Sequence, residues 1–133
     1  MRKLTLILTT LIFSVMFSSS TSFAGWTKVD EDVGATFYVD FESIKKRGGY
    51  VYYWVLVDLL KPTEYGILSG KGYVQGDCKK FRYKWLSGTF HKGPMGGGTG
   101  EVSEPPAKDK GWKYPPPDSV IEEILKSVCQ YAR

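Results

Sequence analysis

The chain has 133 residues with 18 basic and 14 acidic side chains, which gives a formal net charge of +4. Aromatic residues make up 15% of the chain, and there are 15 glycines, one histidine and two cysteines. This length suits one domain, and the charge is too small for a typical nucleic-acid-binding protein. A single histidine excludes the usual histidine-based zinc sites, and the aromatic and glycine content favours a sheet with tight turns.

The first 24 residues are typical of a secretory signal peptide. Arg2 and Lys3 precede an apolar run from Leu4 to Phe17, and Ala24 offers a cleavage site. The run is shorter than the ~20 residues of a membrane-spanning helix, so we expect no transmembrane segment after cleavage. The mature chain, residues 25–133, is then a single domain with a charge of +2, located in the periplasm, in the medium or at the cell surface. No cysteine lies near the expected cleavage site, so we expect no acceptor for a bacterial lipid anchor there.

The mature chain opens with a predicted hairpin. A short strand from Trp26 to Val29 is followed by acidic residues and Gly34, and Ala35 to Asp40 returns beside it. Phe41 to Lys46 has weak helical spacing, and the two glycines after it end the pattern at Gly48. We expect a single helical turn there.

The strongest strand signal follows, at Tyr50 to Leu60, where nearly every residue is β-branched or aromatic. We expect this strand in the interior of the sheet. Its side chains alternate between two faces, and because both faces are apolar, both need cover. One face carries Val51, Tyr53, Val55, Val57 and Leu59, and the other carries Tyr50, Tyr52 and Trp54.

A second hairpin is predicted between Leu68 and Phe90, with a turn near Lys79 and Lys80. Aromatic residues alternate with basic residues along its return strand. Phe81, Tyr83 and Trp85 occupy one face, and Lys80, Arg82 and Lys84 occupy the other. Residues 93–110 then combine glycine, proline and charge without periodicity, which predicts a mobile loop.

The C-terminal segment predicts a helix that begins at Ser119, since Ser119 and Glu122 form a capping-box pattern before an apolar stripe. Cys129 lies beside that stripe. Export implies an oxidising compartment, in which Cys78 and Cys129 should pair as a disulfide. The predicted fold is therefore α+β: a curved antiparallel sheet of five to six strands, packed with one C-terminal helix and held by one disulfide.

The first set of candidate binding residues is basic. It consists of Lys79, Lys80, Arg82 and Lys84. These side chains are either a solvated face of the sheet or a contact for an acidic or polyanionic partner, and the sequence leaves both interpretations open.

The second set is aromatic and consists of Tyr50, Tyr52 and Trp54. These rings either pack under the stiff segment Trp112 to Pro117 or form an exposed surface for docking or for a homodimer. The sequence alone favours neither alternative.

The order of these features resembles the surface-adhesin protein E family of small exported bacterial proteins. The resemblance rests on Trp26 to Val29, Phe37 to Asp40 with Ser43 and Ile44, Val51 to Asp58 followed by Lys61 and Pro62, Asp77 with Cys78, Gly93 to Gly96, and Pro117 to Cys129. It implies an antiparallel sheet, a C-terminal helix and paired cysteines. It also implies a protein without catalytic activity that binds host extracellular-matrix or serum proteins, with haem as a further ligand in the family.

The sequence contains few residues that would support catalysis or the binding of a metal or cofactor. With His91 as the one histidine, the sequence predicts no catalytic site, no metal site and no cofactor. Haem is the alternative, with His91 or a tyrosine as axial ligand and Met95 nearby, but we expect a solvated His91 beside the loop. A rival function is inhibition of host lysozyme in the periplasm, for which Ser69 to Tyr73 would supply a polar loop.

Overall fold

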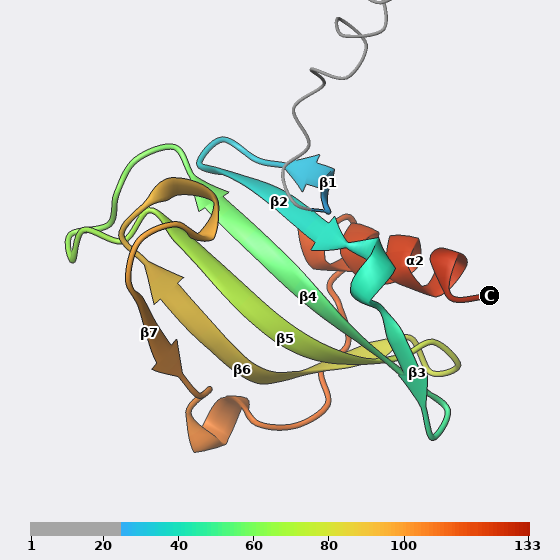
Figure 1. Ribbon diagram of the computed structural model, residues 1–133. Helices are drawn as coiled ribbons and strands as arrows, with labels where there is room; N and C mark the ends of the chain where they lie inside the picture. The colour runs from blue at the N-terminus through green and yellow to red at the C-terminus, as the bar shows by residue number, and fades with distance from the viewer. Residues whose placement is uncertain (1–24) are drawn as a thin grey trace, which may run out of the picture.

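One antiparallel sheet organises the chain in the computed structural model, which describes residues 25–133 (Figure 1). The predicted signal peptide lies outside the described residues. Neighbouring strands follow the order β1-β2-β4-β5-β6-β7, and β3 pairs with the start of β4. The strands are β1 (Trp26–Glu31), β2 (Ala35–Asp40), β3 (Lys45–Arg47), β4 (Tyr50–Leu59), β5 (Ser69–Asp77), β6 (Arg82–His91) and β7 (Gly100–Ser103).

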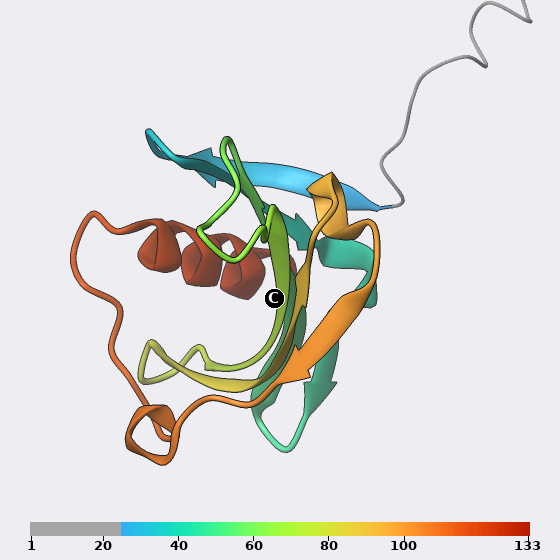
Figure 2. The same cartoon turned by 90° about the vertical axis from the view of Figure 1, so that its left-hand side faces the viewer.

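A single helix, α2 (Val120–Tyr131), lies on one side of the sheet, and the sheet curves around it (Figure 2). This arrangement confirms the predicted α+β class. The central strand β4 directs its odd-numbered residues toward α2, as its alternation predicts. Apolar side chains of both elements are buried in the core between them. The buried core consists of Val39, Val51, Tyr53, Val55, Val74, Tyr83, Ile124, Leu125 and Val128.

The start of α2 follows the capping pattern. Ser119 Oγ accepts a hydrogen bond from the Glu122 amide at 3.1 Å, which satisfies one of the free N–H groups of the first turn. The Glu122 carboxylate accepts from the Asp118 amide at 3.3 Å, one residue earlier than in an ideal capping box. A helix of 12 residues is marginal alone in water, so the burial of Leu125 and Val128 must stabilise it.

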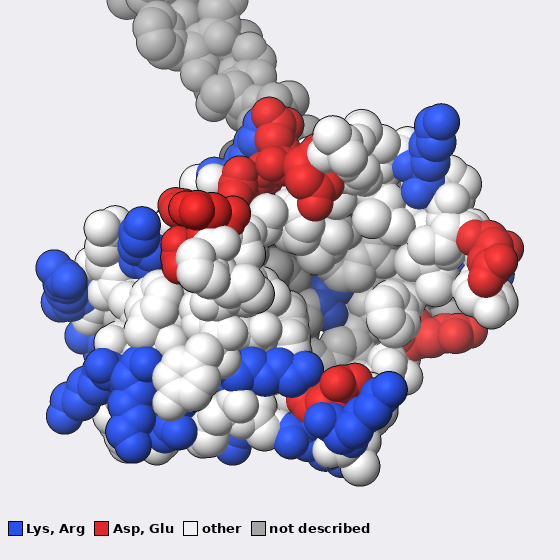
Figure 3. Space-filling view, turned by 180° about the vertical axis from the view of Figure 1, so that it is seen from behind, with Lys and Arg blue, Asp and Glu red and all other residues white. Residues whose placement is uncertain are grey.

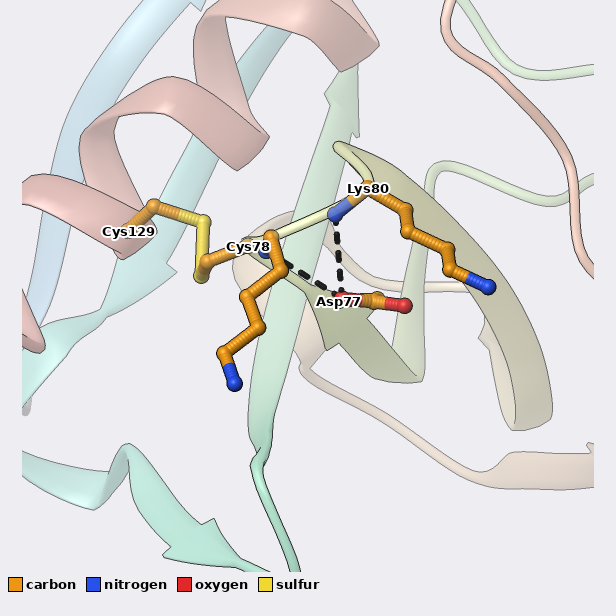
Figure 4. Close-up of a disulfide and its surroundings, with 5 residues drawn as sticks. Asp77, Cys78, Lys80 and Cys129 are labelled. Carbon is orange, nitrogen blue, oxygen red and sulfur yellow. Dashed lines mark hydrogen bonds between the residues drawn. A yellow bond between two sulfur atoms is a disulfide. The ribbon is translucent and has the colours of Figure 1, made fainter.

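Cys78 and Cys129 form the predicted disulfide, with their Cα atoms 5.7 Å apart (Figure 4). Cys78 lies in the exposed turn between β5 and β6, and Cys129 lies in the last turn of α2. Asp77 closes the turn, since its carboxylate accepts hydrogen bonds from the amides of Lys79 at 3.1 Å and Lys80 at 3.2 Å. The disulfide therefore joins the helix to a hairpin turn that two hydrogen bonds to Asp77 close.

The prediction of a mobile loop over residues 93–110 is wrong. Strand β7 pairs with the last four residues of β6, and Pro94–Gly96 and Ala107–Asp109 form the 3-10 turns η2 and η3. Gly96 and Gly98 adopt positive φ angles of 74° and 76° within a turn that brings the Gly93 amide 3.1 Å from the Gly97 carbonyl oxygen. The glycines here build a turn, which sequence periodicity does not reveal.

The helical turn predicted for residues 41–46 is right only in its first half. Phe41–Ser43 form the 3-10 turn η1, but the following residues form β3. Strand β2 pairs with residues 55–59 of β4, and β3 pairs with residues 50–52 on the same side of β4. Because β3 and β7 are both short, the sequence did not reveal them, and the sheet has seven strands where five or six were predicted.

Candidate functional site

The face of the sheet opposite α2 carries a row of aromatic side chains. Tyr50, Tyr52 and Trp54 alternate with the core residues of β4, so they point away from the helix. Tyr73 on β5 pairs with Trp54, and its ring centroid lies 4.8 Å from that of Trp54 and 6.1 Å from that of Tyr52. All four side chains are partly exposed. Tyr52, Trp54 and Tyr73 thus form one cluster of rings across two strands, and Tyr50 lies on the same face.

Trp112 extends this row. The next residue, Lys113, exchanges two backbone hydrogen bonds of 2.9 and 2.8 Å with Tyr83, which holds the segment against β6. The ring centroid of Trp112 lies 5.3 Å from that of Tyr50. Tyr50 therefore packs against the segment that begins at residue 112, as one sequence-based alternative predicted, whereas the other two rings of the predicted set contact β5 instead.

Basic side chains lie among these rings. Arg82 Cζ lies 4.3 Å and Lys84 Nζ 4.6 Å from the centroid of the Trp112 ring, and Arg47 Cζ lies 4.8 Å from that of Tyr52. These distances are typical of cation–π contacts. The structure thus brings together five of the seven predicted binding residues and adds three more. The basic–aromatic face, as we call it, consists of Arg47, Tyr50, Tyr52, Trp54, Tyr73, Arg82, Lys84 and Trp112.

Asp77 holds one of these cations in place. Arg82 Nε donates a hydrogen bond to Asp77 Oδ2 at 2.9 Å, and the Asp77 side chain is only 7% exposed. Burial raises the pKa of Asp77, but hydrogen bonds from the Lys80 amide, from Arg82 and from the Lys79 amide outweigh burial, so the pKa lies below its ordinary value. The same ionised carboxylate therefore orients Arg82. It also closes the turn beside the disulfide (Figure 4).

The predicted basic series divides at the turn. Lys79 and Lys80 lie in the exposed turn and not on the strand that carries Arg82 and Lys84. Lys79 instead lines a hollow of about 400 Å³ beside the disulfide, and none of the described residues that line this hollow is acidic. Figure 3 shows basic side chains gathered at the lower left of the view. The cations that line the basic hollow, as we call it, are Lys46, Arg47, Lys79 and Arg133.

A second concave surface lies on the side of the sheet that carries α2, and Figure 3, which views that side, shows a hollow near its centre. Its volume is about 630 Å³, and we call it the apolar groove. Gly70, Gly72 and Gly88 leave room in its floor, and Trp85 lies so close to Gly72 that a Cβ there would overlap the indole ring. The sequence did not reveal this groove, because a glycine in a strand indicates weak packing and not the shape of a surface. The walls include Val55, Val57, Leu59, Ile67 and Phe90.

His91 is buried, which corrects the expectation of a solvated histidine. It is 8% exposed, and its Nε2 lies 2.8 Å from Thr89 Oγ1. Nearby, the Met95 amide donates a hydrogen bond of 2.8 Å to Asp58 Oδ1, which fixes η2 against β4. Axial coordination of haem needs a ring nitrogen that faces the ligand, so this enclosed position does not favour His91 as an axial ligand.

Ser69 to Tyr73 do not form the polar loop that the lysozyme-inhibitor hypothesis requires. They lie within β5, and Ser69 is 1% exposed. Ser69 Oγ donates a hydrogen bond of 2.7 Å to the Gly93 carbonyl oxygen and accepts one of 2.8 Å from the Gly96 amide. The hypothesis that the protein inhibits lysozyme therefore has no support from these residues.

The residues that the structure describes contain neither a candidate metal site nor a helix that could span a membrane. Among residues 25–133, no group of three or more His, Cys, Asp or Glu side chains is placed to hold a metal ion. Within the same range, none of the helices has the length and apolarity needed to cross a membrane. The fold and the basic–aromatic face define a small β-sheet domain whose exposed rings and cations are suited to binding.

The chain belongs to the surface-adhesin protein E family, whose sequence profile matches residues 26–130. This confirms the resemblance seen in the sequence. A search of curated protein sequences found no match. Among solved structures, crystal form II of Haemophilus influenzae protein E is 18% identical with a TM-score of 0.64, and the match covers 86% of this chain and 94% of that chain. Protein E from non-typeable Haemophilus influenzae is 19% identical with a TM-score of 0.62, and the match covers 84% and 79%. These structures show that the fold is shared.

Proposed function

We propose that this protein is an exported, non-catalytic binding protein of the bacterial cell envelope that attaches to host extracellular-matrix or serum proteins. Membership of a family of surface adhesins supports this function and an exposed location. The observation that carries the proposal is the basic–aromatic face, which gathers rings and cations on the side of the sheet that α2 leaves free. Aromatic and arginine side chains are enriched at protein interfaces because they bury much area and make several contacts.

The charges on this face favour an acidic partner surface. Arg82 is paired with Asp77, but Arg47 and Lys84 form no ion pair within 4.0 Å among the described residues. Unpaired cations attract an acidic partner over about one Debye length, ~8 Å at physiological salt, and speed its association. Binding should therefore weaken as salt is added.

The direct test is binding of the mature protein to immobilised matrix extract and serum proteins over a range of salt concentrations. The double substitution of Arg47→Ala and Lys84→Ala should weaken binding and flatten its salt dependence, because two positive charges are lost from the face. Lys61→Ala is the matched control, since Lys61 is an exposed cation in the loop between β4 and β5. An unchanged salt response in the double variant would contradict the proposed role of the face.

Exposure on the cell decides whether a host ligand can be reached. Protease added to intact cells should digest the protein, and fractionation of the cells should then find none of it protected. A protein that is protected until the outer membrane is opened would contradict adhesion, although it could still bind a ligand in the periplasm.

A homodimer, which the sequence left open as an alternative, would compete for the same rings. If the basic–aromatic face forms a homodimer, binding to matrix should rise less than in proportion to the protein concentration, because only the monomer exposes the face. Sedimentation of the mature protein over a range of concentrations, compared with the Trp54→Val variant, measures this equilibrium. If the protein sediments as a monomer at every concentration, the homodimer is excluded.

A further inference from the structure

We infer that the basic–aromatic face recognises an acidic polysaccharide, a linear chain of sugar rings that carry carboxylate or sulfate groups. The inference rests on the proposed function, because it names the chemistry by which the protein would recognise a host matrix. It goes further than the proposed function in one respect: the protein would bind the polysaccharide chains of the host matrix and not its polypeptides.

The aromatic row offers flat apolar surfaces to sugar rings. A sugar ring presents C–H bonds on one side, and these bonds pack against an aromatic π surface. Tyr50, Tyr52 and Trp54 recur at every second residue of β4, so the three rings extend over ~14 Å of strand. Tyr73 and Trp112 widen the row, since their centroids lie 4.8 and 5.3 Å from those of Trp54 and Tyr50. The row therefore has the length of a short oligosaccharide.

The cations on the face favour an anionic sugar. Arg47 lies over the ring of Tyr52, and Arg82 and Lys84 lie against the ring of Trp112. A sugar ring stacked on a neighbouring aromatic side chain would place its acidic substituent at the edge of the ring, where these cations are. A guanidinium group can donate paired hydrogen bonds to carboxylate or sulfate.

The basic hollow continues the positive surface beyond the end of the row. Arg47 and Tyr50 belong to both surfaces, because they also line the hollow. Lys46, Lys79 and Arg133 supply further cations there. A repeating polyanion that passes along the row toward the disulfide can thus keep its charges paired, which an isolated acidic patch on a protein cannot do.

The position of the row within the sheet disfavours an extended peptide. Strand β5 is paired on both sides along the stretch that carries these rings. Strand β4 pairs with β5 on one side and, on the other, with β3 at residues 50–52 and with β2 at residues 55–59, so few backbone groups are free to bind an added strand. Rings on a sheet instead recognise flat or ring-shaped groups by stacking. Sugars and nucleic-acid bases both have this shape, and the experiment distinguishes them.

The test measures binding of the mature protein to sulfated chondroitin and heparin oligosaccharides. Three comparison probes separate the contributions: dextran has sugar rings without charge, poly-glutamate has charge without sugar rings, and oligo-thymidylate has charge with bases. We expect the acidic oligosaccharides to bind at least ~10-fold more tightly than dextran and poly-glutamate, since each probe lacks one type of contact. Tighter binding of oligo-thymidylate would overturn the inference in favour of a nucleic-acid ligand.

Substitutions locate the site. The double substitution of Trp54→Val and Tyr73→Val keeps the charge and the strand propensity, and it should weaken oligosaccharide binding roughly tenfold. Lys84→Gln should weaken binding and reduce its salt dependence, whereas Lys61→Gln should leave both unchanged. Thermal unfolding confirms that each variant is folded. If a folded ring variant binds like the native protein while both lysine variants lose affinity equally, the attraction is nonspecific and the inference is wrong.

Treatment of the matrix with polysaccharide lyases separates this inference from the proposed function. Loss of binding after treatment supports recognition of the glycan. Binding that survives treatment, and that free oligosaccharide does not inhibit, overturns the inference but leaves host-protein binding in place. A protein that binds neither native nor treated matrix, nor serum proteins, contradicts both.

Discussion

The disulfide between Cys78 and Cys129 tests how α2 is held on the sheet. Replacing both residues by Ser removes a cross-link between positions 51 residues apart. In the chain-entropy model, a closed loop of this size contributes about 4 kcal/mol by restricting the unfolded chain. The whole free energy of unfolding of a small domain is about 5–15 kcal/mol, so the loss should be a large fraction of the total.

The packing of α2 determines whether the fold survives that loss. Ile124, Leu125 and Val128 are almost completely buried against the sheet. Burying one such side chain contributes roughly 1.5–3 kcal/mol, so the three together should contribute more than the disulfide does. We therefore expect the variant without cysteines to stay folded with α2 on the sheet, and to unfold at a lower concentration of denaturant.

Urea unfolding, followed by circular dichroism and tryptophan fluorescence, measures both effects. With a slope of about 2 kcal/mol per molar urea, a loss of 4 kcal/mol lowers the midpoint by about 2 M. The reduced native protein is the control and should coincide with the double variant. A midpoint that shifts by less than about 0.5 M would refute the entropic reasoning. Loss of the helix signal in buffer would refute the packing argument.

Three further predictions concern stability and are tested by urea or thermal unfolding. Leu125→Ala leaves a cavity at a fully buried position and should cost about 3 kcal/mol in the urea titration. Gly72→Ala should displace the Trp85 ring, lower the midpoint and change the fluorescence, whereas Gly70→Ala, whose Cβ would meet its neighbours at 3.5 Å or more, should be close to neutral. The pKa of Asp77 is lower in the folded protein than its ordinary value of 3.8, so the ionised carboxylate stabilises the fold above that pH and loses this effect as the pH falls through the folded pKa. Asp77→Asn should accordingly lower Tm at pH 7 and have little effect once native Asp77 is protonated; equal losses at both pH values would contradict this linkage.

The architecture was predictable where short-range patterns decide it. The period-two alternation of β4 separates core residues from outward rings, and the capping residue Ser119 marks the start of α2. The disulfide followed from the export signal together with two cysteines, Cys78 and Cys129. Each of these inferences depends on residues that act within one strand, one turn or one covalent bond, so no knowledge of strand register was needed.

The candidate site was predictable only within single strands. The β4 rings and the pair Arg82 and Lys84 could be grouped from alternation alone. Their assembly into one surface depends on contacts between distant segments. Tyr73 packs against Trp54 because β5 pairs with β4 in one register, and Trp112 joins the row because the segment after η3 forms a bridge to β6. A shift of one residue in that register would place Tyr73 on the opposite face.

The two wrong expectations around His91 have one physical cause. A glycine-rich segment has no hydrophobic period, so its tertiary contacts are made by backbone groups that the sequence does not mark. In this chain the Gly96 amide bonds to Ser69 Oγ, the Met95 amide bonds to Asp58, and β7 then pairs along β6 up to His91. These backbone contacts both order the segment and enclose the histidine ring. Glycine therefore indicates here a close approach of chain to chain, and Gly70, Gly72 and Gly88 of β5 and β6 likewise lie under the apolar groove.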